Sequence, residues 1–473
     1  MEHSSGGWDE ARMTRMDRLL STASARLGLL HLALVTLALG TGTLLATLLH
    51  FRAGPDHLTT LRGHGLVMTM LVLVPAIPGV LGNLALPEAL GLRELAFPRL
   101  GRAAVALHAL AFVTFVVAAQ TGGVSVGFEL HMAHSGALAG AGVSWALLTV
   151  ALSAGAIGLL SIRILASVLS SPRRTALGSG LAASSALASV SSPLALATLA
   201  MAALDRALGL GVVEASAGGD PALHAVLVGV VMNLFLTSSI LAALAVITHV
   251  IDLHATPMHA RVTTATFLGL ALTGTLGGAQ QLVSLDVGAS AALRMGTFDV
   301  LHHALLLSLV LRWLLALRRG ADTTSTPLHF GLSAMAMLAI ALPSGFALAL
   351  PSVGAFLQSS AFATGRLHYL AVGGVLLALL AGITEQWPRL VGVALSRERT
   401  GLGLGLVLAG TQLAFLPMLL LGARGTPRPL PPELGVEWLV VSGVGLVLLV
   451  TGPVLVGASL LGTLRVEPEE PQT

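Results

Sequence analysis

The chain alternates between long apolar runs and short polar links. A transmembrane helix needs about 20 consecutive apolar residues to cross the hydrocarbon core of a bilayer, and the sequence offers twelve such runs. They cover approximately residues 27–49, 64–86, 103–123, 137–161, 179–203, 223–251, 263–285, 299–317, 328–350, 366–384, 401–422 and 437–461. The pattern therefore predicts an all-α integral membrane protein, a bundle of twelve transmembrane helices.

The links are rich in proline, glycine and arginine, and only the link at 204–222 is long enough to cover much surface. No segment is long enough to form a soluble domain of useful size. We therefore expect a single membrane domain over residues 1–473, with short polar tails on either side of 27–461. The first apolar run is too long for the core of a signal peptide, so we expect an uncleaved first span.

Composition supports this fold class and excludes others. Apolar residues make up 55% of the chain and charged residues only 10%, whereas soluble domains average about 25% charged residues. All 25 basic residues are arginine, and most of them lie in links instead of forming a basic patch on a soluble domain, which argues against a nucleic-acid partner. The absence of cysteine excludes disulfides, thiolate-bound iron–sulfur clusters and covalently attached c-type heme.

The distribution of arginine predicts the orientation of the bundle, because cytoplasmic links carry an excess of basic residues. The N-terminal segment and the even-numbered links hold Arg12, Arg15, Arg18, Arg93, Arg99, Arg102, Arg163, Arg173, Arg174, Arg261, Arg318, Arg319, Arg389, Arg397 and Arg399. The odd-numbered links hold chiefly Arg52, Arg62, Arg206, Arg294, Arg424 and Arg428. Both termini should therefore face the cytoplasm.

Two histidines within predicted spans are candidate ligands. His64 opens the second span and His368 lies in the tenth, and an ionisable residue at membrane depth is costly enough to suggest a function. Neutral imidazoles from two neighbouring helices can bind one iron from opposite faces. Spacing alone leaves the alternative that each ring is buried and satisfied by a backbone carbonyl.

Five segments, taken in order, resemble subunit I of the heme-copper oxidases. They are HGLVMTMLVLVPAIPGVLGNLALPEALGLRELAFPRL at 64–100, AGGDPALH at 217–224, ITHVID at 247–252, RLHYLAVGG at 366–374 and GTQLAFLPMLLLGARGTP at 410–427. The resemblance implies the twelve-helix fold of that family. It also implies that His64 and His368 are the axial ligands of a low-spin heme, for which a b-type is favoured. Arg428 matches one arginine of the family's propionate-binding pair, and Arg52 is a further polar anchor for the heme.

The same resemblance implies that the oxygen-reducing centre is missing. Arg366 stands where the family has the ligand of its high-spin heme, and a guanidinium has no lone pair to offer. Asn233, Gln280 and Gln281 stand in the positions of the three copper-binding histidines, and amides are poor copper ligands beside imidazole. The single tyrosine of the chain is Tyr369, and there is no lysine for a lysine-based proton channel. We expect one heme and no copper.

These features predict an oxidase-like subunit of the bacterial inner membrane that keeps one low-spin heme. It would transfer electrons or support neighbouring membrane subunits of a respiratory complex, an oxidase subunit or a cytochrome among them, without reducing oxygen by itself. One alternative is a genuine terminal oxidase or nitric oxide reductase subunit with an unconventional centre, which requires Arg366, Asn233, Gln280 and Gln281 all to be wrongly placed. Another is a heme-free structural or transport protein on the same bundle.

Overall fold

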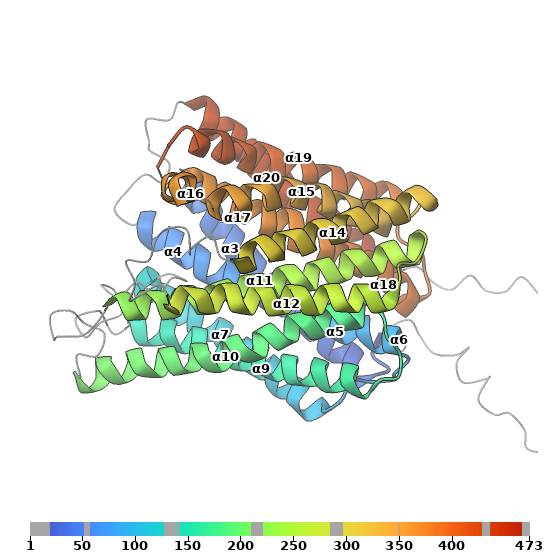
Figure 1. Cartoon of the computed structure of the whole chain (residues 1–473), viewed down its shortest axis with the longest axis horizontal. Coiled ribbons are helices and arrows are strands. Elements are labelled where there is room, and N and C mark those ends of the chain that lie inside the picture. The colour runs from blue at the N-terminus through green and yellow to red at the C-terminus, as the bar shows by residue number, and fades with distance from the viewer. Residues whose placement is uncertain are drawn as a thin grey trace, which may run out of the picture.

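The protein is a bundle of long helices that run side by side (Figure 1). The structure, a computed structural model, describes residues 19–51, 57–126, 140, 142–209, 221–283, 297–349, 351–427 and 436–465. The elements in chain order are α3 (Ala23–Phe51), α4 (His57–Val67), η1 (Met68–Leu73), α5 (Val74–Leu84), α6 (Leu86–Leu90), α7 (Pro98–Gln120), η2 (Gly123–Val126), α9 (Gly142–Ser170), α10 (Ala176–Leu208), α11 (Pro221–His254), α12 (Ala260–Val283), α14 (Thr297–Arg319), α15 (Thr326–Ala349), α16 (Pro351–Gln358), α17 (Ala361–His368), η4 (Tyr369–Leu376), α18 (Leu377–Val391), α19 (Arg397–Ala423) and α20 (Val436–Arg465).

The helices confirm the predicted fold class. Within the described part of the chain, eleven helices are long and apolar enough to cross a membrane. The seventh predicted span coincides with α12, which ends where the described residues stop. Helices suit this environment because they satisfy every backbone hydrogen bond internally, which lipid cannot do. The chain is a multi-pass integral membrane protein.

Glycine allows close contact between the last two helices. A methyl group on Gly403 of α19 would lie 2.8 Å from the carbonyl oxygen of Gly452 of α20, and one on Gly410 would lie 2.7 Å from that of Gly445. Any larger residue at these positions would push the helices apart. Small residues that allow such close approach are typical of helix interfaces in lipid.

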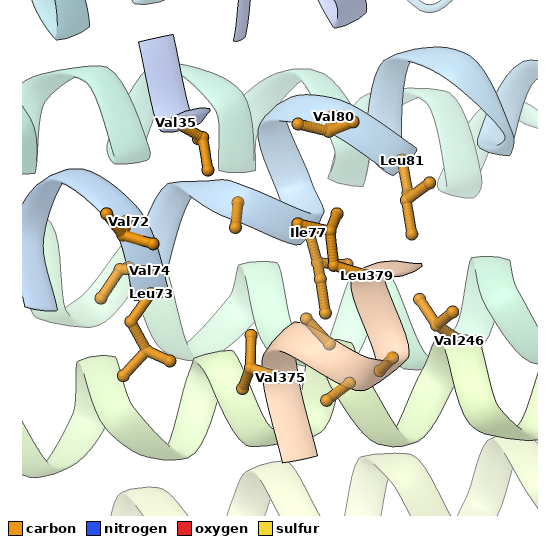
Figure 2. Packing of buried hydrophobic residues seen from close by; sticks show 14 of the residues in the cluster. Val35, Val72, Leu73, Val74, Ile77, Val80, Leu81, Val246, Val375 and Leu379 are labelled. Atoms are coloured by element: carbon orange, nitrogen blue, oxygen red, sulfur yellow. The ribbon is translucent and has the colours of Figure 1, made fainter. Parts of the chain in front are cut away.

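The core lies where the second, sixth and tenth spans meet. Figure 2 shows Ile77 and Leu81 of α5 beside Leu379 of α18, with Val246 of α11 nearby, and all four are nearly or fully buried. The fully buried Phe235 of α11 belongs to the same cluster. This packing brings together the two spans that carry His64 and His368.

A polar network joins the same spans at the opposite end of the bundle from these histidines (right in Figure 1). Glu88 of α6 accepts hydrogen bonds from Gln386 at 2.6 Å and from Arg389 at 3.1 Å, both in α18. Arg389 also pairs with Glu385, which in turn lies 2.6 Å from His254 of α11. The helix α6, which follows the second span, and the sixth and tenth spans are therefore joined by hydrogen bonds as well as by packing.

The structure corrects the expected end of the fourth span. We expected it to end near residue 161 and counted Arg163 among the link arginines, but α9 continues to Ser170 and Arg163 is only 1% exposed. Its guanidinium donates to the Ala96 carbonyl at 2.9 Å, to the Ser24 hydroxyl at 3.2 Å and to the Asn83 side-chain oxygen. A buried charge is tolerated when its donors are satisfied in this way.

Candidate functional site

His64 is held by a backbone carbonyl of the preceding span. It lies in α4, and its Nδ1 is 2.9 Å from the carbonyl oxygen of Gly42 in α3. Because a carbonyl can only accept, Nδ1 carries the proton and donates it in this hydrogen bond. Nε2 of the neutral ring therefore keeps a lone pair, which is the state required of a metal ligand.

His368 is oriented in the same way. It is the last residue of α17, and its Nδ1 donates to the Thr364 carbonyl at 2.8 Å. The ring also stacks on Phe415 of α19, with centroids 4.3 Å apart and planes inclined by 23°. The hydrogen bond fixes the tautomer and the stacking fixes the plane, so Nε2 is again left with its lone pair.

The distance between the two imidazole rings matches that of two ligands of one metal ion. Their centroids lie 6.3 Å apart and their planes are within 13° of parallel. Two imidazoles bound to one metal ion at about 2 Å per bond have centroids about 6 Å apart. Both side chains are half-buried. The residues fit a bis-histidine heme, and their role as its ligands stays a prediction.

Each histidine is followed by a stretch of π-helix, which the sequence did not indicate. Met68–Leu73 forms η1 after His64, and Tyr369–Leu376 forms η4 directly after His368. The two stretches are in contact. π-Helical turns are rare and occur frequently at functional sites, so their occurrence after both histidines marks this part of the bundle independently of the histidines themselves.

Arg366 occupies a different surface of the tenth span from His368. Its Nε donates to the Ala341 carbonyl of α15 at 3.2 Å, and the guanidinium packs on Gly345 of the same helix. Over the described residues, no carboxylate forms an ion pair with it. A guanidinium cannot ligate iron, so this surface of the span presents a cation instead of a heme ligand.

The other predicted positions are placed only in part. Asn233 is half-buried in α11, two residues before Phe235, and no hydrogen bond joins it to Arg366 among the described residues. Gln280 and Gln281 lie near the end of α12, with side chains outside the described part of the chain. Arg52 and Arg428, the predicted anchors of the heme, lie outside the described residues altogether.

Comparison with known proteins assigns the family. Residues 26–449 match the family described as "Cytochrome C and Quinol oxidase polypeptide I". The chain belongs to this family. Heme binding is typical of its members, which agrees with the pair of lone-pair nitrogens on His64 and His368.

The similarity to individual members is distant but extends over most of the chain. Cytochrome c oxidase subunit 1 of Thermostichus vulcanus is 26% identical over 385 residues, which is 78% of this chain and 68% of that protein. Cytochrome c oxidase subunit 1 of Candida albicans is 25% identical over 470 residues, which cover 93% of this chain and 87% of that protein. The probable quinol oxidase subunit 1 of Staphylococcus haemolyticus is 24% identical over 423 residues, which cover 86% of this chain and 64% of that protein.

A solved structure shares the fold. The cryo-EM structure of a heme-copper terminal oxidase dimer superposes with a TM-score of 0.69 at 16% sequence identity, and the match covers 95% of this chain and 86% of that one. At this identity the likeness concerns the arrangement of helices alone. It confirms the oxidase subunit I fold that the sequence predicted.

Proposed function

We propose that this protein is a cytochrome c oxidase subunit I-like membrane protein that binds one low-spin heme and has no oxygen-reducing centre of its own. The observation that carries the proposal is the pair His64 and His368, 6.3 Å apart, each with Nδ1 bound to a carbonyl and Nε2 free to ligate. The heme, when bound, supplies one-electron chemistry at its iron. The chain has no cysteine for covalent attachment, which excludes a c-type heme, and we propose a b-type.

The role of the two histidines is to hold and tune the iron while excluding other ligands. His64 and His368 would hold the iron of a bound heme through their two Nε2 atoms, which would leave no position at the iron for oxygen. The carbonyls of Gly42 and Thr364 orient the rings and increase the basicity of the ligating nitrogens through the Nδ1–H hydrogen bonds. Such a site suits electron transfer and does not suit oxygen chemistry.

The absence of a catalytic centre is proposed from the residues at the family's ligand positions. Arg366 replaces the ligand of the high-spin heme, and Asn233, Gln280 and Gln281 replace the copper ligands. The guanidinium of Arg366 lies against α15, and the fully buried Phe235 packs in the core of the bundle close to Asn233 in sequence. Both are groups that bind no transition metal, and we propose that no copper is present.

The remaining assignments follow from membership of the family. We propose that Arg52 and Arg428 contact the heme propionates. We propose further that the protein works beside other membrane subunits of a respiratory complex, such as an oxidase subunit or a cytochrome, with which its heme exchanges electrons. The arginine distribution supports a bacterial inner-membrane location with both termini in the cytoplasm.

The test is a metal count and a visible spectrum of the purified protein. We expect one iron and no copper per chain, and sharp reduced-minus-oxidised bands that carbon monoxide leaves unchanged. Two irons per chain, or a copper that survives chelation, would contradict the heme-only assignment, as would cyanide-sensitive oxygen consumption well above that of free heme. A complete absence of heme would favour a structural or transport role.

Substitution of the histidines then tests the ligands. His64→Ala or His368→Ala should each remove the low-spin spectrum. The matched control is His50→Ala, because His50 lies in α3 and its Nε2 contacts the Leu439 carbonyl of α20 at 2.8 Å. The control should keep the spectrum of the wild-type protein. A low-spin spectrum that persists in either ligand variant would show that another residue binds the iron.

A further inference from the structure

The π-helical stretch η4 needs support from neighbouring helices. It begins at Tyr369, the residue after the proposed ligand His368. π-Helical turns are rare and occur mostly as single turns inside α-helices, so contacts with neighbouring helices are needed to hold this longer stretch. If η4 reverted to α-helix, the phase of His368 relative to the rest of the span would change. Whatever stabilises η4 therefore also sets the direction of the His368 ring.

Two side chains from neighbouring helices form a brace across η4. The Tyr369 hydroxyl donates to Oε1 of Gln412 in α19 at 2.5 Å, and Nε2 of Gln412 donates to Sδ of Met337 in α15 at 3.4 Å. Met337 packs on Gly373, where an added methyl group would lie 2.9 Å from its Cγ. The chain of contacts thus leaves η4 at Tyr369 and returns to it at Gly373.

The same face of α19 also holds the histidine ring. Gln412 and Phe415 are three residues apart, so their side chains lie on one side of the helix. Phe415 stacks on His368 at 4.3 Å while Gln412 binds Tyr369. Gly365 allows α19 to approach, because a methyl group there would lie 3.0 Å from the Leu419 amide nitrogen. One helix therefore contacts both residues at the junction of α17 and η4.

We propose that Gln412 is a positioning residue for the second axial ligand: through Tyr369 and Met337 it maintains the π-helical turn that fixes the angle of the His368 ring. This inference rests on the proposed heme site. Among the described residues the side chain of Gln412 forms hydrogen bonds with Tyr369 and Met337, and none with the His368 ring. Its effect reaches the heme through the orientation of an axial imidazole, and outer hydrogen bonds of this kind tune ligand strength and redox potential.

The experiment compares Tyr369→Phe, Gln412→Leu and the double variant with the wild-type protein. Each should keep its heme, because both imidazoles remain, but the highest g-value in the electron paramagnetic resonance spectrum and the midpoint potential should shift. Heme release to an acceptor protein should become about two- to tenfold faster, the worth of one buried hydrogen bond. The double variant should resemble Gln412→Leu instead of summing the two single variants, because both substitutions remove the Tyr369–Gln412 hydrogen bond.

Thr411→Val is the matched control. Thr411 is fully buried in the same helix beside Gln412, but its hydroxyl donates to the Val407 carbonyl of its own helix at 2.7 Å. It should leave the g-values and the potential as in the wild-type protein. An equal shift in this control would mean that general packing, and not the brace, sets the ligand angle, and the inference would be wrong.

The remaining outcomes separate this inference from the proposed function. A wild-type protein that contains no heme would overturn both. A wild-type protein with a low-spin heme whose spectrum, potential and release rate are unchanged in Tyr369→Phe and Gln412→Leu would overturn the positioning role alone. Shifts confined to variants of the brace would support both.

Discussion

Replacing either candidate axial histidine with alanine should create a site that free imidazole can refill. The variant loses the low-spin spectrum and binds carbon monoxide, because one coordination position of the iron is open. Added imidazole should enter the space vacated by the ring and restore the low-spin bands. The two sites should differ in affinity, because their surroundings in the structure differ.

The size of the difference follows from the neighbours of each ring. Both imidazoles donate one hydrogen bond to a carbonyl, at 2.9 Å for His64 and 2.8 Å for His368, so this contribution cancels. His368 also stacks on Phe415, whereas His64 has no aromatic neighbour besides His368 among the described residues. An aromatic pair contributes about 0.5–1.5 kcal/mol beyond its buried area. Imidazole should therefore bind His368→Ala about two- to tenfold more tightly than His64→Ala.

The assay is a titration of each purified variant with imidazole. Binding is monitored through the low-spin absorption band of the reduced heme. Phe415→Leu in the His368→Ala background should remove the tighter binding of imidazole, while it preserves an apolar side chain of similar volume. Equal Kd values for imidazole in the two single variants would refute stacking on Phe415 as the source of the tighter binding. Failure of imidazole to restore the band in either variant would refute the assignment of the ligands.

Three further outcomes are expected. Phe235→Ala should destabilise the purified protein by about 3 kcal/mol or more through the cavity it leaves, whereas Phe298→Ala, at a side chain that is 36% exposed, should cost far less in the same thermal unfolding assay. Arg366→His should give no oxygen consumption with an artificial donor, because on the proposed assignment Asn233, Gln280 and Gln281 offer no imidazole to a copper ion. Thr324 donates through its hydroxyl and its amide to Asp322 and so lowers the pKa of that exposed carboxyl. The stabilisation is present above the ordinary carboxyl pKa and lost as pH falls through the lowered value, so Asp322→Asn should reduce Tm at pH 7 and have less effect near pH 3.

Hydrophobic pattern was sufficient to predict the spans but not their ends. Residues 437–461 were expected as the last span and α20 runs over Val436–Arg465, because an unbroken apolar run leaves little choice in lipid. The fourth span was underestimated because an arginine normally ends a span. The groups that satisfy Arg163 are Ala96, 67 residues away, and Ser24, 139 residues away. Such partners are visible only after folding.

The candidate site was predicted to a similar degree. His64 and His368 were named because ionisable residues are costly within apolar spans and because their segments resemble those of the oxidase family. The structure places the two rings 6.3 Å apart, and their role as ligands stays a prediction. The brace could not, since Gln412 and Met337 are ordinary residues of membrane helices until Tyr369 is placed beside them. The π-helical stretches also left no sequence signal, because VMTMLVLV at 67–74 reads as uniform α-helix.

The stretch η1 makes chain length as important as residue type in the second span. A π-helical turn holds one more residue than the α-helical turn it replaces, so it takes up the extra residue while the helix before it keeps its direction relative to the helix after it. Substitutions that close the stretch Met68–Leu73 into regular α-helix at its full length would turn the extra residue into additional rotation of the span. His64 would then turn by about 100° with respect to the buried face of α5. Such a variant would keep every side chain named as a ligand and still lose the site, an inheritable change that no inventory of conserved residues would detect.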